Sequence, residues 1–434
     1  MEPILVIAEG VRTPFLKSGS EAKDLSAAEL GRQVMQALFK RAPVDPKEVD
    51  EIIFGCVAQP FDAANVTRVA QINAGLPLSI PSYTVHRNCS SSMQSVTNAC
   101  ESILAGRAQV VVAGGMESLS STPLVYNKKA TDWLGKLGRA KTPMQKAMLF
   151  LKAPLADMIL RPRVSLVEGL SDPTCGLGMG QTAEILANEF GLSRTMQDQY
   201  AVESHQKAAK AQAAGRFDRE IAPLFAGKDL APILKDNGIR PDSSLEKLGK
   251  LKTVFARDHG TVTAGNASQI TDGAVALLIT TLDRAKAWGL KPLAVIKGQA
   301  YAGLDPRRMG LGPVYSTGRL FKQMNLSMAQ MDVVEINEAF AAQVLSCLKG
   351  FEDPKIAVDR LGLDKAAGAV DPAKLNINGG AIALGHPVGS SGGRLLLTLA
   401  HELIERKAQQ GLATLCVGGG QGAAFVLERT SETR

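Results

Sequence analysis

Apolar and polar residues follow one another in blocks that predict strands alternating with helices along most of the chain. A strand is expected at Ile4–Ala8. A helix follows from Asp24 to about Lys40, where Ser26 and Glu29 have the spacing of a capping box. Further strands are expected at 50–55, 82–85 and 109–113, and a further helix at 65–74. This order predicts a mostly parallel sheet that helices cover on both faces.

The pattern changes after Pro123, because from there to about Leu251 strand signals are few and prolines interrupt the helical stretches. Alternation then resumes, and each half of the chain contains an apolar strand that ends in glycines, at 111–115 and at 415–420. We therefore predict an internal duplication of two α/β halves. Their expected bounds are 1–122 with 252–284 and 285–434, and the expected insertion is a mainly helical loop domain at 123–251.

Cys89 stands at the point where an extended run, Ser82–Val85, gives way to a helical stretch that Gly106 ends. The free N–H groups at a helix N-terminus favour negative charge, and the thiolate is the nucleophilic form of cysteine. This position suits a nucleophile. It suits a buried structural cysteine equally well.

Three later stretches also contain residue types that carry chemistry. Asn337-Glu-Ala-Phe follows a strand. His386 lies in a flexible, small-residue loop, Asn378 to Arg394, that precedes a helix, and Cys416 lies at the end of a strand before Val-Gly-Gly-Gly. Taken singly, His386 could be a structural histidine, Cys416 a core residue, and the glycines close-packed turns.

Together with Arg12-Thr13-Pro14, these stretches resemble the thiolase family in position and order over essentially the whole chain. The resemblance implies a duplicated fold of five α-β-α-β-α layers with an inserted loop domain. It also implies acyl transfer between coenzyme A (CoA) thioesters, as an acetyl-CoA acyltransferase that cleaves a 3-ketoacyl-CoA or runs the reverse condensation. A degradative role in fatty-acid β-oxidation is the favoured expectation.

The resemblance implies a role for each of these residues. Cys89 would attack the ketoacyl carbonyl to form an acyl-enzyme, His386 would take the thiol proton, and Cys416 would act as the acid/base at carbon. One oxyanion hole would use His386 with a water held by Asn337, and the other the N–H groups of Cys89 and Gly418.

CoA contacts are implied at Met179, Ala264 and Ser268. CoA is the expected co-substrate, and neither a metal nor a tightly bound cofactor is expected. The chain departs from the family at Gly178, where many small-substrate members carry histidine, and at His86, where the family usually has asparagine. Both changes bear on the preference for acyl-chain length.

The net charge of +7 is concentrated in one segment of the chain. Residues 128–163 hold nine basic residues (128, 129, 136, 139, 141, 146, 152, 161 and 163) and two acidic ones (132 and 157), so that 9 − 2 = 7 accounts for the whole excess. The same segment contains an apolar stripe: Met144, Ala147, Met148, Leu151, Leu155, Met158 and Ile159. It could be a lid for the CoA phosphates, a surface for lipid or for a β-oxidation partner, or an ordinary solvated face.

Six cysteines without a Cys-x-x-Cys pair favour a reducing compartment, and the N-terminus shows no signal-peptide pattern. A cytoplasmic protein is expected, with acyl-CoA and CoA as partners, assembled as a homodimer or a dimer of dimers, and with no nucleic-acid partner. Three alternatives stay open: an acetoacetyl-CoA-forming biosynthetic acetyltransferase, a ketoacyl synthase, and a non-catalytic protein that binds lipid or acyl-CoA.

Overall fold

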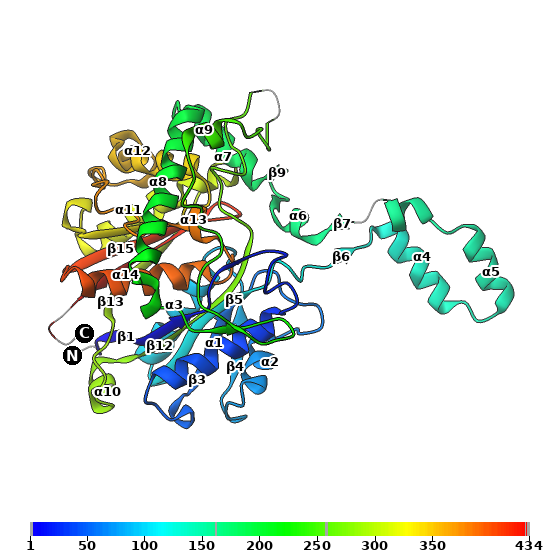
Figure 1. Ribbon diagram of the computed structural model, residues 1–434, viewed down its shortest axis with the longest axis horizontal. Coiled ribbons are helices and arrows are strands. Elements are labelled where there is room, and N and C mark those ends of the chain that lie inside the picture. The colour runs from blue at the N-terminus through cyan, green and yellow to red at the C-terminus, as the bar shows by residue number, and fades with distance from the viewer. Residues whose placement is uncertain (1–2, 161–162, 257–258, 430, 432–434) are drawn as a thin grey trace. The chain divides into compact units, whose positions relative to one another are not determined.

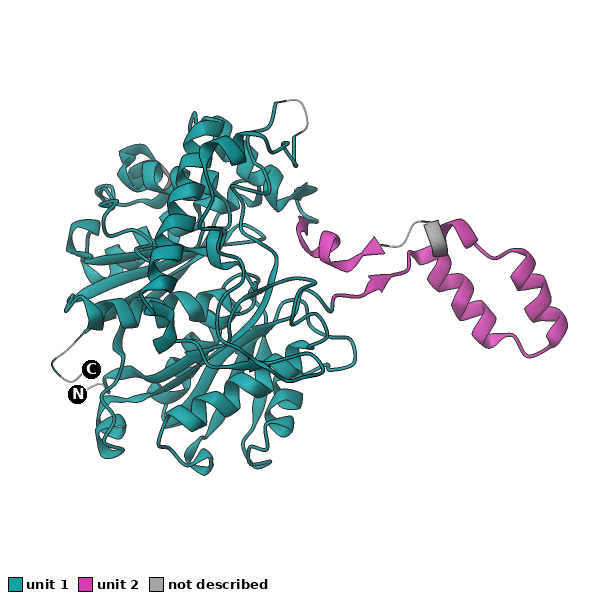
Figure 2. Cartoon of the chain, viewed as in Figure 1, with its two compact units in different colours: residues 1–121, 172–434 teal, residues 122–171 magenta. Residues whose placement is uncertain are grey.

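The structure, a computed structural model, describes residues 3–160, 163–256, 259–429 and 431 (Figure 1). The chain forms two compact units, one of residues 1–121 with 172–434 and one of residues 122–171 (Figure 2). Residues 172–251, which we expected in the insertion, therefore belong to the larger unit. The domain bounds drawn from the sequence stay predictions.

The first half of the larger unit contains most of the strands and helices that the apolar pattern predicts. In α1 the Ser26 side chain accepts a hydrogen bond from the Glu29 N–H, as the capping-box spacing indicates. The elements are β1 (Leu5–Arg12), α1 (Ala27–Arg41), β3 (Glu51–Gly55), α2 (Val66–Asn73), β4 (Ser82–Val85), α3 (Ser91–Leu104), β5 (Val110–Glu117) and β12 (Thr271–Thr281).

The second half repeats this order. Its elements are β13 (Ala294–Gly303), α11 (Gly312–Met324), β14 (Val333–Ile336), α12 (Ala341–Glu352), α14 (Ser391–Glu405), β15 (Gln410–Val417) and β16 (Gln421–Glu428). In the first half, β4 pairs in parallel with β3. In the second half, the segment at Leu375 takes the corresponding position, because a parallel bridge joins it to Val334 of β14. Two helices, α7 (Met179–Glu189) and α8 (Arg194–Ala213), also belong to the larger unit.

The strands form one sheet in the order β14-β15-β16-β13-β1-β12-β5-β3-β4, and β1 joins the two halves through Val6–Val295 and Ile7–Ala294. The expectation of a mostly parallel sheet is wrong. Only β3–β4, β3–β5 and β14–β15 pair in parallel, whereas β12 and β16 each lie antiparallel to both of their neighbours. The reason is that β15 turns directly into β16 within three residues, which only an antiparallel pair allows.

Helices pack against the two halves of the sheet in three places, each with its own apolar core. Three helix layers and two sheet layers thus alternate, which gives five layers (Figure 1). Val110 and Val112 of β5 face α1 and α2, whereas Val111 between them faces α3. The middle core holds residues of both α3 and α14 together with strands of both halves. On the far side, α11 and α12 cover the strands of the second half. The arrangement is the five-layer α-β-α-β-α fold that the resemblance implies.

The smaller unit contains the α-helices α4 (Lys128–Arg139), α5 (Pro143–Leu151) and α6 (Ser165–Gly169). It also contains the strand pair β6 (Leu124–Val125) and β7 (Arg163–Val164). Its capping is regular: Asn127 caps α4, and Thr142 with Gln145 forms a capping box at α5. Among the described residues, none of the helices combines the length and the apolar character of a membrane span.

Candidate active site

Cys89 lies half-buried in the turn between β4 and α3. The residue before it, Asn88, has a φ of 43°, in the left-handed region that asparagine tolerates better than most residues. Its side-chain amide donates a hydrogen bond of 2.7 Å to the carbonyl oxygen of Gly418. The turn that carries Cys89 is thereby tied to the turn between β15 and β16, more than three hundred residues later in the chain.

Opposing effects set the pKa of Cys89. Burial raises it, whereas the backbone N–H groups of Gly418 and of Cys89 itself lower it, and burial prevails. We expected the helix N-terminus to favour the thiolate, but α3 begins two residues later, at Ser91, and the net shift is upward. The resting thiol therefore needs a base to lose its proton.

His386 is buried, and both of its ring nitrogens have side-chain neighbours. Nδ1 lies 2.6 Å from the Ser391 hydroxyl, and Nε2 lies 3.5 Å from the Asn337 side-chain nitrogen. Ser391 Oγ is also 3.1 Å from the carbonyl oxygen of Pro387. If the hydroxyl donates to that carbonyl, it accepts from Nδ1–H, which leaves the Nε2 lone pair available to take a proton.

The pKa of His386 is lowered to about 4, first by burial and then by the positive charge of Arg394. At neutral pH the imidazole is therefore uncharged. An uncharged imidazole whose Nε2 carries a lone pair can act as a base towards a thiol, which is the chemistry that Cys89 requires.

The loop that carries His386 is packed into the interior, not the flexible segment that its glycines suggested. Residues 376–393 are almost all buried, and Gly385 has a φ of 102°. A Cβ there would lie 2.2 Å from Thr271 Cγ2, so only glycine fits. Farther along, the Gly389 N–H donates a 2.7 Å hydrogen bond to Glu117, the last residue of β5.

Glu117 is a buried carboxylate that ties three backbone segments together. Besides the Gly389 N–H, it accepts hydrogen bonds from the N–H groups of Ala58 (2.8 Å) and Val57 (3.2 Å). Burial raises its pKa to about 7, although these backbone hydrogen bonds oppose the shift. The carboxylate thus connects the β3–α2 loop to the loop of His386.

Cys416 is buried near the end of β15, two residues before Gly418. Burial raises the pKa of its thiol well above the ordinary value, and the charges of Cys89 and Cys347 raise it further. Gly418, two residues after Cys416, is bound by the side chain of Asn88, the residue before Cys89. Met179, Met309 and Phe340 pack in the same apolar cluster as Cys416.

Asn337 directly follows β14, where its N–H donates a 3.0 Å hydrogen bond to the Thr414 carbonyl oxygen. Its side-chain oxygen is buried and has no hydrogen-bond partner among the described residues. The next residue, Glu338, is held by Tyr200, Ser204 and Asn376, at 3.0, 2.6 and 2.9 Å. The backbone around Asn337 is thereby fixed, while one amide oxygen is left for a further partner.

The three expected CoA contacts lie in different settings. Met179 is the first residue of α7, and its sulfur lies 3.4 Å from the position that a Cβ on Gly418 would take. Ser268 is half-buried, and its N–H donates to the Ala339 carbonyl oxygen at 2.9 Å. Ala264 is exposed on the loop that precedes β12.

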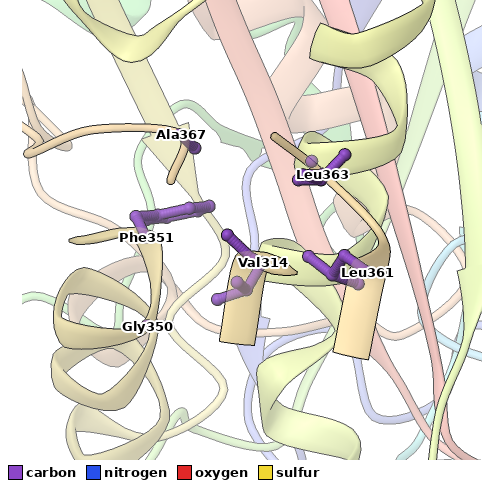
Figure 3. A pocket seen from close by; sticks show the side chains of 8 residues that line it. Val314, Gly350, Phe351, Leu361, Leu363 and Ala367 are labelled. Atoms are coloured by element: carbon purple, nitrogen blue, oxygen red, sulfur yellow. The ribbon is translucent and has the colours of Figure 1, made fainter. Parts of the chain in front are cut away.

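The structure thus brings the Cys89 turn to Gly418, two residues after Cys416, and pairs Asn337 with His386. Asn88, Glu117 and Ser391, which hold these groups in place, were not among the predicted site residues. Only Ser391 had a signal in the sequence, because it lies five residues after His386 in the same predicted loop. A small apolar hollow between α11 and the end of α12, lined by Val314, Phe351 and Leu361 among others, has no polar side chain in its wall and lies outside this site (Figure 3).

Comparison with known proteins places the whole chain in one family. Residues 5–283 match the family model described as thiolase, N-terminal domain, and residues 290–429 match thiolase, C-terminal domain. A probable acetyl-CoA acyltransferase of Staphylococcus epidermidis is 39% identical over 428 residues, which cover 98% of each chain. A 3-ketoacyl-CoA thiolase of Shewanella piezotolerans is 37% identical over 425 residues, 98% of this chain and 96% of the relative.

Solved structures agree with these matches. A crystal structure of the Bacillus anthracis acetyl-CoA acetyltransferase has a TM-score of 0.84 at 37% identity, and covers 98% of this chain and 99% of its own. Human mitochondrial 3-ketoacyl-CoA thiolase in complex with CoA has a TM-score of 0.84 at 36% identity, with 99% and 98% covered. On the agreement of sequence, fold and the arrangement of the site, this chain belongs to the thiolase family.

Proposed function

We propose that the protein is an acetyl-CoA acyltransferase that cleaves a 3-ketoacyl-CoA with CoA, giving acetyl-CoA and a shortened acyl-CoA. The observation that carries the proposal is the connection between the two turns that bear the thiols: Asn88, next to Cys89, donates a hydrogen bond to the carbonyl oxygen of Gly418, two residues after the buried Cys416. Thiolases as a family and the names of the relatives support the same activity.

In the first step, His386 Nε2 takes the Cys89 proton while the sulfur adds to the C3 carbonyl of the substrate. The C2–C3 bond then breaks, its electron pair passes to the acetyl-CoA enolate, and the acyl group stays on Cys89. Cys416 donates its proton to C2 and completes acetyl-CoA. The raised pKa of Cys416 suits this donor role, because the thiol stays protonated until a strongly basic carbanion forms.

In the second step, the Cys416 thiolate takes the proton of the CoA thiol while the CoA sulfur attacks the Cys89 thioester. The bond between the acyl carbon and the Cys89 sulfur then breaks, the acyl group leaves as the shortened acyl-CoA, and His386 returns its proton to the Cys89 sulfur. Negative charge develops on two oxygens. One is the C3 carbonyl oxygen, which becomes the acyl oxygen of the Cys89 thioester and is charged in both steps; the other is the thioester oxygen of the departing acetyl-CoA, in the first step. The N–H groups of Cys89 and Gly418 are suited to stabilise one such oxygen, and His386 with a water on Asn337 would stabilise the other.

Gly418 limits what can stand beside the nucleophile, since a side chain there would point towards Met179 and Asn88. We infer that Met179, Ala264 and Ser268 contact the pantetheine of CoA. CoA acts as a co-substrate, and the chemistry above uses the chain's own groups. A homodimer and a degradative role in β-oxidation are part of the proposal.

A second function, formation of acetoacetyl-CoA from two acetyl-CoA molecules, follows from the same chemistry in reverse and is the activity named for the Bacillus anthracis neighbour. Thiolysis rates measured against acyl-chain length separate the two. A broad or long-chain preference supports the degradative role, whereas activity confined to acetoacetyl-CoA supports the biosynthetic one. Loss of the thiolysis signal with every substrate, in a folded protein, would leave only a binding function.

A further inference from the structure

Helices α4 and α5 of the smaller unit pack against each other through only part of their apolar surface. Trp133 of α4 donates a 2.9 Å hydrogen bond to the Leu149 carbonyl oxygen of α5, and its ring meets Phe150 edge-to-face at 5.8 Å. On α4, Lys128 and Arg139 point away from this contact, since they lie on the other side of the helix from Trp133.

Another face of α5 carries a stripe of apolar side chains in solvent. Met144, Met148 and Leu151 recur at the i, i+4, i+7 spacing of one helical face, and they are 73%, 54% and 88% exposed. Leu155, 60% exposed, follows just beyond the helix. A contiguous exposed apolar surface of this kind is typical of a site that binds another protein or a membrane.

Lysines surround this stripe. Lys141 and Lys152 lie at the two ends of α5, and Lys146 lies on its other side. In the part of the chain that the structure describes, none of the three belongs to an ion pair, whereas Lys128 is paired with Asp132 and Arg163 with Glu168. Arg161, counted in the basic segment, lies outside the described residues. The segment 128–163, whose charge balance equals the +7 of the whole chain, thus carries an exposed apolar stripe.

We propose that α5 with its flanking residues (141–155) docks on the surface of an anionic phospholipid bilayer. The apolar stripe enters the boundary between headgroups and acyl chains, and the lysines stay at the level of the phosphates. The charge argues for this occupant, because the core of a protein interface is depleted of lysine, whereas an anionic leaflet attracts it. The inference goes beyond the thiolase chemistry and does not depend on it.

The test is cosedimentation of the full-length protein with vesicles of phosphatidylcholine alone and of phosphatidylcholine mixed with phosphatidylglycerol. The intact protein should sediment with the anionic vesicles and stay in solution with the neutral ones. Added salt should weaken the binding, because it screens the lysines.

Two triple variants test the two components of the surface separately. Lys141→Gln, Lys146→Gln and Lys152→Gln together should lower the partition constant about fivefold per charge. Met144→Gln, Met148→Gln and Leu151→Gln should lower it on the order of tenfold or more at unchanged charge. A matched control with the same charge change, Lys23→Gln, Lys40→Gln and Lys365→Gln at exposed positions of the larger unit, should bind like the intact protein.

Equal binding by the control and by the α5 charge variant would overturn the proposal, since charge anywhere would then suffice. Absence of sedimentation with anionic vesicles would also overturn it, whether or not the segment then retains a protein partner. Thiolysis of a short, soluble 3-ketoacyl-CoA, measured on every variant, should stay unchanged. That assay keeps a failure of docking distinct from a failure of the proposed enzyme activity.

Discussion

The nucleophile of the proposed mechanism lies where its charged form is disfavoured at rest. Burial outweighs the two N–H groups at the Cys89 sulfur, and so its pKa rises. The same burial keeps His386 uncharged and able to accept the proton. Thiolate formation is thereby coupled to the approach of substrate, which brings the carbonyl carbon that accepts the sulfur.

Ser391 is the residue that we expect to fix the tautomer of His386. Ser391→Ala removes the partner of Nδ1 while it leaves every group that touches substrate. The rate of Cys89 acylation should fall by about tenfold to hundredfold, because the imidazole loses its orientation. KM should change little. Rapid-quench measurement of acyl-enzyme formation gives this rate directly.

The matched control is Ser390→Ala. Its hydroxyl is equally buried but donates to the Gly273 carbonyl oxygen at 2.7 Å and does not touch the imidazole. Equal losses of acylation rate in both variants would mean that Ser391 only supports packing.

The pH dependence of acylation tests the state of His386. An ordinary histidine, with a pKa of 6.5, would become protonated as the pH falls through that value, and the base would be lost. With its pKa lowered to about 4, His386 stays neutral between these two values, so the acylation rate should show no inflection at 6.5. An acid limb centred near 6.5, measured by rapid quench, would contradict the assignment.

At the scale of elements, the site lies on loops whose backbones are fixed by hydrogen bonds to the side chains of Glu117 and Asn88. Glu117 at the end of β5 holds both the β3–α2 loop and Gly389, three residues from His386. Asn88 similarly ties the Cys89 turn to the β15–β16 turn. These connections set the distance between catalytic groups that are far apart in the chain.

Glu117→Gln tests the first of these connections. The amide keeps one acceptor oxygen but presents an NH₂ group to a backbone N–H, so one of the three hydrogen bonds is lost. The free energy of unfolding should fall by about 1–3 kcal/mol, and kcat should fall with it. Urea denaturation and a thiolysis assay measure both. The exposed Glu101→Gln on α3 serves as the control, and an equal effect of the two changes would refute the role.

The apolar pattern could predict most strands and helices of the first half, because each has a clear period and a clear stop, as at Ser26 and Gly106. It could not predict strand direction, since Ala274–Thr280 reads as a buried strand whether its neighbours run parallel or antiparallel. The motifs around Cys89, His386 and Cys416 could be identified because their glycines and polar residues are dense. Glu117 and Asn88 could not, since their partners at Gly389 and Gly418 are set only by the folded chain.

The two halves of the molecule share their central core. Residues of α3 from the first half and of α14 from the second pack in one cluster, and β1 pairs with β13. The residues of the proposed mechanism divide in the same way, with Cys89 in the first half and His386 and Cys416 in the second. Neither half therefore has a complete site.

This shared core predicts that the two halves unfold together. Leu397→Ala in α14 should cost about 2–5 kcal/mol and shift a single cooperative transition. Hydrogen exchange followed by mass spectrometry should show protection lost in α3 as well as in α14. Leu104→Ala, at a half-exposed position at the end of α3, should change little. Loss of protection confined to the second half would contradict the shared core.

The most direct test of the proposed chemistry is the site of the covalent intermediate. The protein is incubated with acetyl-CoA, quenched in acid, digested and analysed by mass spectrometry. The intact protein and Cys416→Ala should each carry one acetyl group on Cys89, and Cys89→Ala should carry none. An acetyl group found on another residue, or retained in Cys89→Ala, would contradict the account.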